Sequence, residues 1–202
     1  MTRRFAALLV PVLLAVAGCT ATDQQAAPPT ATRPERPSPF ADCATLTSAP
    51  ASVAPAPAGG PGQPLPELTL SCFTGGAPVD LRDLRGPAVI NVWASWCPPC
   101  RKELPAFQRL SDRSAGRFQV VGINSRDSRS AAQSIGEDFG VRFPMLVDQG
   151  DALQRALNRN AFPLTLFVDA EGRVRHTDAT GALDDARLAA LVRQHLGVEM
   201  SA

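Results

Sequence analysis

Two cysteines, Cys97 and Cys100, are separated by two prolines, and this spacing is typical of redox chemistry. The thiols lie about one helical turn apart, so they can form a small disulfide ring and reopen it with little backbone movement. We predict that Cys97, with better access, is the nucleophile and that Cys100 resolves the mixed disulfide. The alternative is half of a zinc site. His176 and His195 are isolated in the sequence, so we predict no metal.

The cysteines are predicted to lie between a buried strand and the start of a helix. Residues 88–93 are almost continuously apolar and rich in β-branched side chains, which indicates a strand buried on both faces. After the cysteines, Leu104, Phe107 and Leu110 recur at helical spacing. A thiolate at the helix N-terminus faces unpaired N–H groups and the positive end of the helix dipole, which lower its pKa.

Three prolines modify this helix. Pro98 and Pro99 suit the first helical turn, where N–H groups have no partner within the helix. Neither can donate an N–H to the Cys97 sulfur, so we expect less thiolate stabilisation than two free amides would give. We also expect both to contact substrate. Pro105 should kink the helix or mark the end of its first segment.

The motif and its surroundings resemble a known family. Val-Ile-Asn-Val-Trp-Ala before Trp-Cys-Pro-Pro-Cys, and Arg-Lys-Glu-Leu-Pro after it, are similar to the TlpA/ResA/CcmG (DsbE-type) branch of membrane-tethered bacterial thioredoxin-like proteins. The resemblance covers residues 62–198. It implies an α/β thioredoxin-like fold, in which a central mixed β-sheet is flanked by helices, with an N-terminal β-hairpin and a helical insertion. It also implies extracytoplasmic thiol–disulfide exchange without a bound cofactor.

The first residues are typical of an export signal. Arg3 and Arg4 precede an apolar run at 5–16 that is too short to span a bilayer stably, and small residues precede Cys19. This segment resembles a bacterial lipobox, which implies cleavage before Cys19, lipidation of its sulfur and membrane attachment, as in an actinobacterial lipoprotein. The alternatives are an ordinary secreted protein with an incidental cysteine and an uncleaved membrane helix.

Export determines how the other cysteines are interpreted, because disulfides persist outside the cytoplasm. Of the five cysteines, Cys19 is assigned to the lipid and Cys97–Cys100 to redox chemistry, which leaves Cys43 and Cys72. The even remainder suggests a structural Cys43–Cys72 disulfide that closes a loop of about 30 residues. The rival interpretation is a second exchange pair, which lacks the strand-to-helix setting.

The composition divides the chain into a tether and one folded domain. Residues 20–66 are rich in proline, alanine, threonine and serine, which is typical of an extended, semi-stiff tether. We therefore predict a signal peptide at 1–18, a tether at 19–61 and a domain at 62–198. Residues 40–46 would be ordered locally by the proposed disulfide.

The rest of the domain alternates between strands and helices, which indicates a mixed sheet covered by helices. Residues 68–73 and 78–81 predict a hairpin, and Asp151 lies near the N-cap of a later helix. Further strands are predicted at 118–123, 144–147, 164–168 and 173–177, further helices at 128–139, 151–157 and 184–196, and a helical turn at 81–84.

Glu103 falls within the apolar stripe of the predicted helix, on the Cys100 side. A carboxylate on the buried face should have a raised pKa and can move protons to and from the cysteine pair as a general acid and base. The alternative is a glutamate that reaches solvent from the first turns, where its charge suits the helix dipole. The resemblance favours proton transfer, because the ResA-like branch has a glutamate at this place.

Pro163 opens a predicted strand, and a proline there is usually only a boundary marker with a trans bond. The family places a cis-proline opposite the disulfide at the matching position, so the resemblance implies a cis Phe162–Pro163 bond. That turn would present the Phe162 backbone beside Cys97, where a substrate segment can pair in strand fashion. We expect Trp96 to cover the disulfide and contact substrate, with core packing as the alternative.

Together these residues predict a thiol–disulfide oxidoreductase, lipid-anchored at the extracytoplasmic face of the membrane, that acts on protein dithiols and disulfides. The resemblance implies a reductase in cytochrome c maturation, with apocytochrome c as substrate and a CcdA-type membrane reductase as electron donor. Two alternatives stay open: a disulfide oxidase for exported proteins, and a dithiol copper chaperone, although no Met or His adjoins the motif. Lys and Arg nearly balance Asp and Glu, 20 against 19, so no basic patch argues for nucleic acid.

Overall fold

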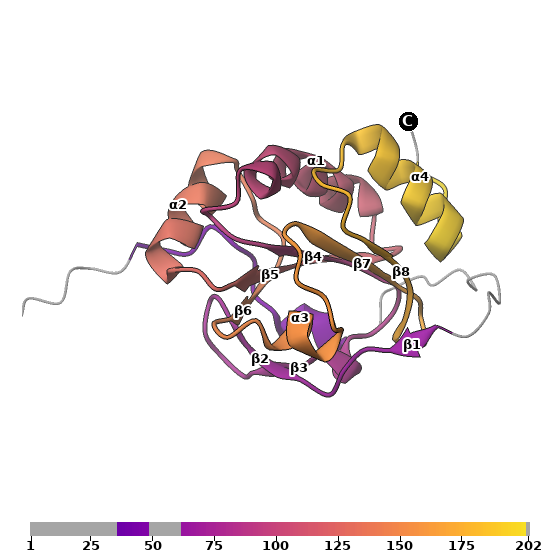
Figure 1. The fold of residues 1–202 in the computed structure, drawn as a ribbon, viewed down its shortest axis with the longest axis horizontal. Coiled ribbons are helices and arrows are strands. Elements are labelled where there is room, and N and C mark those ends of the chain that lie inside the picture. Colours follow the sequence, from indigo (N-terminus) through magenta and orange to yellow (C-terminus); the bar gives the residue numbers. More distant parts are fainter. Residues whose placement is uncertain (1–35, 49–61, 201–202) are drawn as a thin grey trace, which may run out of the picture. The chain divides into compact units, whose positions relative to one another are not determined.

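The computed structural model describes residues 36–48 and 62–200 of the chain. An eight-stranded mixed sheet, formed within residues 62–200, is its centre (Figure 1). The central strand is β4 (Ala88–Trp93), whose six residues are all buried. It pairs in parallel with β5 (Gln119–Ser125) and antiparallel with β7 (Leu164–Val168). The sheet order is β1-β8-β7-β4-β5-β6-β2-β3, and the other strands are β1 (Gln63–Pro64), β2 (Thr69–Cys72), β3 (Val79–Asp80), β6 (Met145–Asp148) and β8 (Arg173–Asp178).

Helices cover both faces of this sheet (Figure 1). α1 (Pro98–Ser114), α2 (Arg129–Asp138) and α4 (Asp185–Leu196) lie on one face. On the other face lie α3 (Ala152–Ala156) and two short 3-10 helices, at Ala44–Thr47 and Leu81–Asp83. Alternate residues of β4 face the two layers, because successive side chains of a strand point to opposite sides. The side chains of Val89 and Trp93 pack with the first layer, and those of Ile90 and Val92 with the second.

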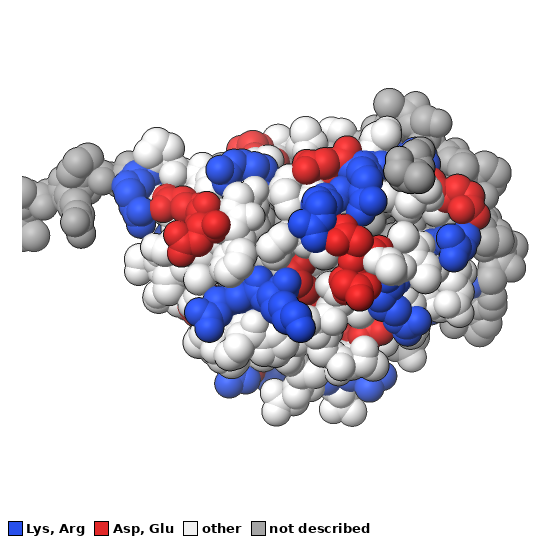
Figure 2. Space-filling model, turned by 90° about the horizontal axis from the view of Figure 1, so that it is seen from above, with Lys and Arg blue, Asp and Glu red and all other residues white. Residues whose placement is uncertain are grey.

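The surface of the layer formed by α1, α2 and α4 carries charges of both signs side by side (Figure 2). Asp185 of α4, for example, accepts from Arg109 at 2.6 Å and from Arg113 at 2.9 Å. These are exposed pairs, which contribute little to stability. They do join α1 to α4 at the surface, above the apolar contact between the two helices.

The start of α1 follows from its sequence. Cys97 is the N-cap, and Pro98 and Pro99 occupy the first helical positions, where a missing N–H costs nothing. Pro105 lies inside α1, which continues beyond it to Ser114. The helix does not end at Pro105, because its neighbours Leu104 and Phe107 are fully buried against the sheet.

A segment of the predicted tether packs on the domain. The folded unit begins at Arg36, and both Phe40 and Cys43 are buried. The Phe40 ring meets Phe73 edge-on, with 4.7 Å between the ring centroids. It also rests on α2 at Gly136, where a Cβ atom would lie 2.5 Å from the ring. The local order predicted for residues 40–46 is present, but the proline-rich composition does not reveal the contacts of Phe40.

The predicted signal peptide at 1–18, the lipidated Cys19 and most of the tether lie outside the described residues. They stay predictions. Within the residues that the structure describes, no helix is long and apolar enough to cross a membrane.

The predicted elements are confirmed with small shifts of their ends, and two details differ. The short edge strand Gln63–Pro64, which pairs with β8, was not predicted, because two residues that include a proline carry no alternating pattern. Asp151 stands at the N-cap of α3, but its side chain caps nothing. Asp148, three residues earlier, accepts from the N–H groups of Ala152 and Leu153 at 2.9 and 3.0 Å.

A disulfide joins Cys43 to Cys72 across 29 residues of sequence. Both half-cystines are buried, so the bond ties residues 36–48 to β2 inside the core rather than at the surface. Neither cysteine lies at the N-terminus of an α-helix, the setting that activates a thiol for exchange: Cys43 precedes the short 3-10 helix Ala44–Thr47, and Cys72 ends β2. The arrangement fits a structural staple.

Replacing both Cys43 and Cys72 with alanine is expected to lower the free energy of unfolding by about 3 to 4 kcal/mol, because the unfolded chain regains the entropy of a long loop. Urea denaturation of the oxidised full chain measures this. The Cys97→Ala/Cys100→Ala variant is the control, since its ring is much shorter and should cost less. An unchanged midpoint in the Cys43/Cys72 variant would contradict the staple.

Candidate active site

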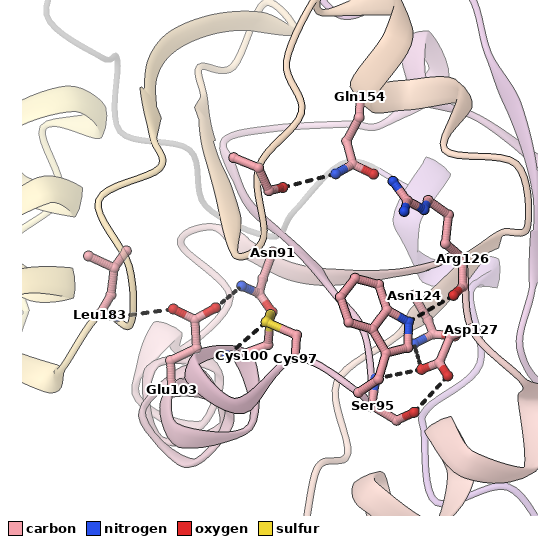
Figure 3. The surroundings of a disulfide bond; sticks show 12 residues. Asn91, Ser95, Cys97, Cys100, Glu103, Asn124, Arg126, Asp127, Gln154 and Leu183 are labelled. Carbon is pink, nitrogen blue, oxygen red and sulfur yellow. Dashed lines mark hydrogen bonds between the residues drawn. A yellow bond between two sulfur atoms is a disulfide. The ribbon is translucent and has the colours of Figure 1, made fainter.

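Cys97 and Cys100 form a disulfide at the N-terminus of α1, with their Cα atoms 5.3 Å apart (Figure 3). The N–H of Cys100 donates to the Cys97 sulfur at 3.2 Å. Pro98 and Pro99 have no N–H to donate, so the sulfur receives fewer of the unpaired backbone N–H groups that a helix N-terminus normally presents. Cys97 is 3% exposed and Cys100 fully buried, so a partner can approach only the Cys97 side. The nucleophilic role of Cys97 stays a prediction, and this geometry is compatible with it.

Glu103 lies one turn after Cys100 on the same face of α1 and is 1% exposed. One of its carboxylate oxygens accepts from Asn91 Nδ2 at 2.6 Å, and the other accepts from the N–H of Leu183 at 3.0 Å (Figure 3). The carboxyl group is therefore held between α1, β4 and the segment before α4. It does not reach solvent.

Burial raises the pKa of Glu103 to about 7. The hydrogen bonds from Leu183 and Asn91 act in the opposite direction, because they favour the charged form, and the charge of Asp178 adds to the increase. Desolvation is the largest of these effects. A buried acid with this pKa can take up or release a proton near neutral pH, as proton transfer to a thiol requires.

Asn91 suits both protonation states of Glu103. Its Nδ2 donates to the carboxylate, while its buried Oδ1 has no hydrogen-bond partner within the described structure. If the amide turns over, Oδ1 can accept from the protonated acid, since 2.6 Å is also a normal O–H···O distance. Asn91 lies opposite Thr165 of β7, which lies opposite Asp178 of β8, and both are buried. The carboxyl group thus faces a row of polar side chains across three strands.

The Phe162–Pro163 peptide bond is cis. Pro163 directly precedes β7, whose first residue, Leu164, lies opposite Val92 near the end of β4. The strand that leads to the cysteines and the strand that follows the cis-proline are therefore neighbours in the sheet. Strand-like pairing of substrate with Phe162 stays a prediction.

Trp96 is 51% exposed, so it is not a core residue. Its indole N–H donates to the carbonyl of Arg126 at 2.9 Å (Figure 3). Its ring meets Phe162 edge-on at 5.0 Å, and the Arg126 guanidinium lies 5.9 Å from the ring centroid. Trp96 thus lies on the surface between the cysteine motif and the cis-proline loop, where a substrate can contact it.

Asp127 organises the loop before the cysteines, and the sequence analysis did not single it out. Its carboxylate accepts from both the backbone N–H and the hydroxyl of Ser95, each at 2.6 Å (Figure 3). It also accepts from Asn124 Nδ2 at 2.9 Å and from the N–H of Ser128 at 2.8 Å. The sequence feature that could have identified Asp127 is its place just after the carboxyl end of a predicted parallel strand, where functional side chains gather in α/β folds.

The two histidines, isolated in the sequence, lie together in the structure. The rings of His176 on β8 and His195 on α4 stack at 4.2 Å, and both lie against Phe167. Burial, together with the charge of His176 and nearby arginines, lowers the pKa of His195. No group of three His, Cys, Asp or Glu side chains in the described part of the chain is placed to hold a metal ion.

The sequence pattern of the Redoxin family matches residues 60–191, well over half of the chain and all of the residues of this site. This chain belongs to the Redoxin family. It is 30% identical over 118 residues to the thioredoxin-like protein YneN of Bacillus subtilis, a match that covers 56% of this chain and 68% of YneN. It is 34% identical over 104 residues to the thiol-disulfide oxidoreductase ResA of the same organism, covering 50% of this chain and 58% of ResA.

A solved structure supports the same relationship. A secreted Mycobacterium tuberculosis disulfide oxidoreductase, described as homologous to E. coli DsbE, superimposes with a TM-score of 0.57 and 27% identity, over 63% of this chain and 96% of that chain. The thioredoxin-like fold is therefore confirmed, and the chain is placed among thiol–disulfide oxidoreductases of the ResA and DsbE type. It spans less than two thirds of the length of ResA.

Glu103→Gln is expected to lower the apparent pKa of the reduced cysteine pair by about one unit. In the unchanged protein Glu103 becomes negative as the pH rises through about 7, and this charge disfavours a thiolate at Cys100. The rate of alkylation of the reduced full chain as a function of pH measures the shift. Glu171→Gln, at an exposed position, is the matched control. The same profile in Glu103→Gln and the unchanged protein would refute the proton-transfer role.

Proposed function

We propose that this protein is a thiol–disulfide oxidoreductase, lipid-anchored at the extracytoplasmic face of the membrane, that reduces disulfides in exported proteins. The observation that carries the proposal is the Cys97–Cys100 disulfide at a helix N-terminus, one turn from a buried carboxyl group whose pKa lies near 7. This combination provides both an electron carrier and a nearby proton carrier. Dithiol–disulfide exchange needs both.

The reaction balances without a bound cofactor. In the reduced protein the Cys97 thiolate attacks one sulfur of a substrate disulfide, which breaks that bond and releases a substrate thiolate that takes a proton. Cys100, after giving its proton to Glu103, attacks the Cys97 sulfur of the mixed disulfide and releases the second substrate thiolate. The substrate gains two electrons, and the Cys97–Cys100 disulfide forms.

The proposed location is supported by sequence and chemistry. The export pattern and the lipobox-like segment before Cys19 would place the chain outside the cytoplasm and attach it to the membrane. The buried Cys43–Cys72 disulfide suits an oxidising compartment, because cytosolic thiol systems keep most cysteines reduced.

The proposed direction is reduction, with apocytochrome c as substrate and a membrane reductase of the CcdA type as electron donor, by likeness to the ResA and DsbE-type relatives. The site geometry favours this direction. A strong oxidant stabilises its reduced form, chiefly the thiolate. Here two prolines withhold N–H donors from Cys97, and Glu103 adds negative charge beside Cys100, so the disulfide form is favoured.

The reduction potential of the Cys97–Cys100 pair decides between reductase and oxidase. Equilibration of the full chain with dithiothreitol or glutathione should give a value closer to that of thioredoxin, about −270 mV, than to that of DsbA, about −120 mV. A value near that of DsbA would favour the oxidase. In the same protein Cys97→Ala should abolish reduction and Cys100→Ala should accumulate mixed disulfides, and equal activity in both variants would refute the assignment.

A further inference from the structure

A hollow of about 400 Å³ lies beside the redox site, between the end of β5 and α3. We call it the arginine hollow. The residues that line it include Arg126, Asp151, Arg155, Asn158, Arg159 and Asn160. With Gln154, which also lines it, three guanidinium groups and three side-chain amides thus surround a single carboxylate, whereas arginines and acidic residues are paired over α1 and α4.

Arg126 connects the arginine hollow to the redox site. Its guanidinium lies 5.9 Å from the Trp96 ring centroid and 5.8 Å from that of Phe162, and it points toward Gln154 (Figure 3). Gln154 in turn donates to the carbonyl of Ala161 at 2.9 Å. One wall of the hollow is therefore the loop that carries the cis-proline, and the hollow opens where substrate is expected to approach.

The charges of the hollow do not cancel. Asp151 accepts from Arg155 and lies 3.6 Å from Arg126, so it is shared between two arginines. The exposed Arg159 side chain makes no ion pair or hydrogen bond within the described part of the chain. The lining therefore carries a net positive charge and unused donors. Guanidinium and side-chain amide groups both donate hydrogen bonds, and a carboxylate can accept from both while its charge pairs with the arginines. The lining therefore fits an acidic side chain.

We propose that the arginine hollow binds acidic side chains of the substrate protein, in the segment that flanks the cysteine under attack. This inference rests on the proposed function and names its substrate class. A substrate strand that pairs with Phe162 and continues past it would run along Asn160 and Arg159, which precede Phe162 in the same loop. Because a strand advances roughly 3.3 Å per residue, side chains about two to four residues from the cysteine would lie over the hollow.

The test uses the reduced full chain and three synthetic peptides that share one disulfide. The three peptides differ only in two residues, which are both Glu, both Gln or both Lys and lie two to four positions from the cysteine. The set is synthesised twice, once with these residues on the N-terminal side of the cysteine and once with them on the C-terminal side. For at least one flank, kcat/KM should be highest for Glu and lowest for Lys, with about a tenfold range at low salt that shrinks at high salt. Equal kcat/KM for the three peptides on both flanks would overturn the proposal.

Variants separate the hollow from the reaction. Arg159→Gln and Arg126→Gln should each reduce the ratio of kcat/KM for the Glu and Gln peptides, and Arg159→Glu should shift the preference toward Lys. Arg193→Gln, at an exposed position on α4, is the matched control and should keep the wild-type ratio. An unchanged ratio in both Arg159 variants would overturn the proposal. Absence of turnover with all peptides would overturn the proposed function and this inference together, whereas equal turnover would overturn the inference alone.

Discussion

The structure depends on one costly contact, the burial of the Glu103 carboxyl group between α1, β4 and the segment before α4. Its pKa rises from 4.5 to about 7, so between these values the folded protein holds a proton that the unfolded chain lacks. Stability contributed by this group is complete below about pH 4.5 and is lost as the pH rises through 7. A core chosen for stability alone would place an apolar residue here. The retained acid, beside Cys100, is what the proposed proton transfer requires.

The residues around Cys97 determine how strongly its sulfur is stabilised by hydrogen bonds. The helix N-terminus offers the Cys97 sulfur one N–H, from Cys100, because the two intervening residues are prolines. Asp127 fixes Ser95 and with it the loop that leads to Cys97. The Cys97 sulfur is therefore held in place and receives a single N–H, which supports the proposed reducing direction.

Sequence reasoning predicted what depends on local patterns. The apolar strand before the cysteines, the buried face of α1 and the position of Glu103 all follow from periodicity, whereas the cis bond at Pro163 required the family resemblance. It could not predict what depends on tertiary pairing. The row of polar side chains from Asn91 through Thr165 to Asp178 can be predicted only once the strand register is known. The stacking of His176 on His195 depends on the packing of β8 against α4. The packing of Phe40 was not predicted, because its partners, Phe73 and Gly136 of α2, are far away in the sequence.

The central claim is that Glu103 is a buried acid that titrates near neutral pH beside the redox pair. The most direct test is the carboxyl titration of Glu103 in the ¹³C-labelled full chain, followed by NMR and assigned with Glu103→Gln. The account predicts a pKa of about 7 in the oxidised protein. A value near 4.5, that of an exposed glutamate, would contradict it.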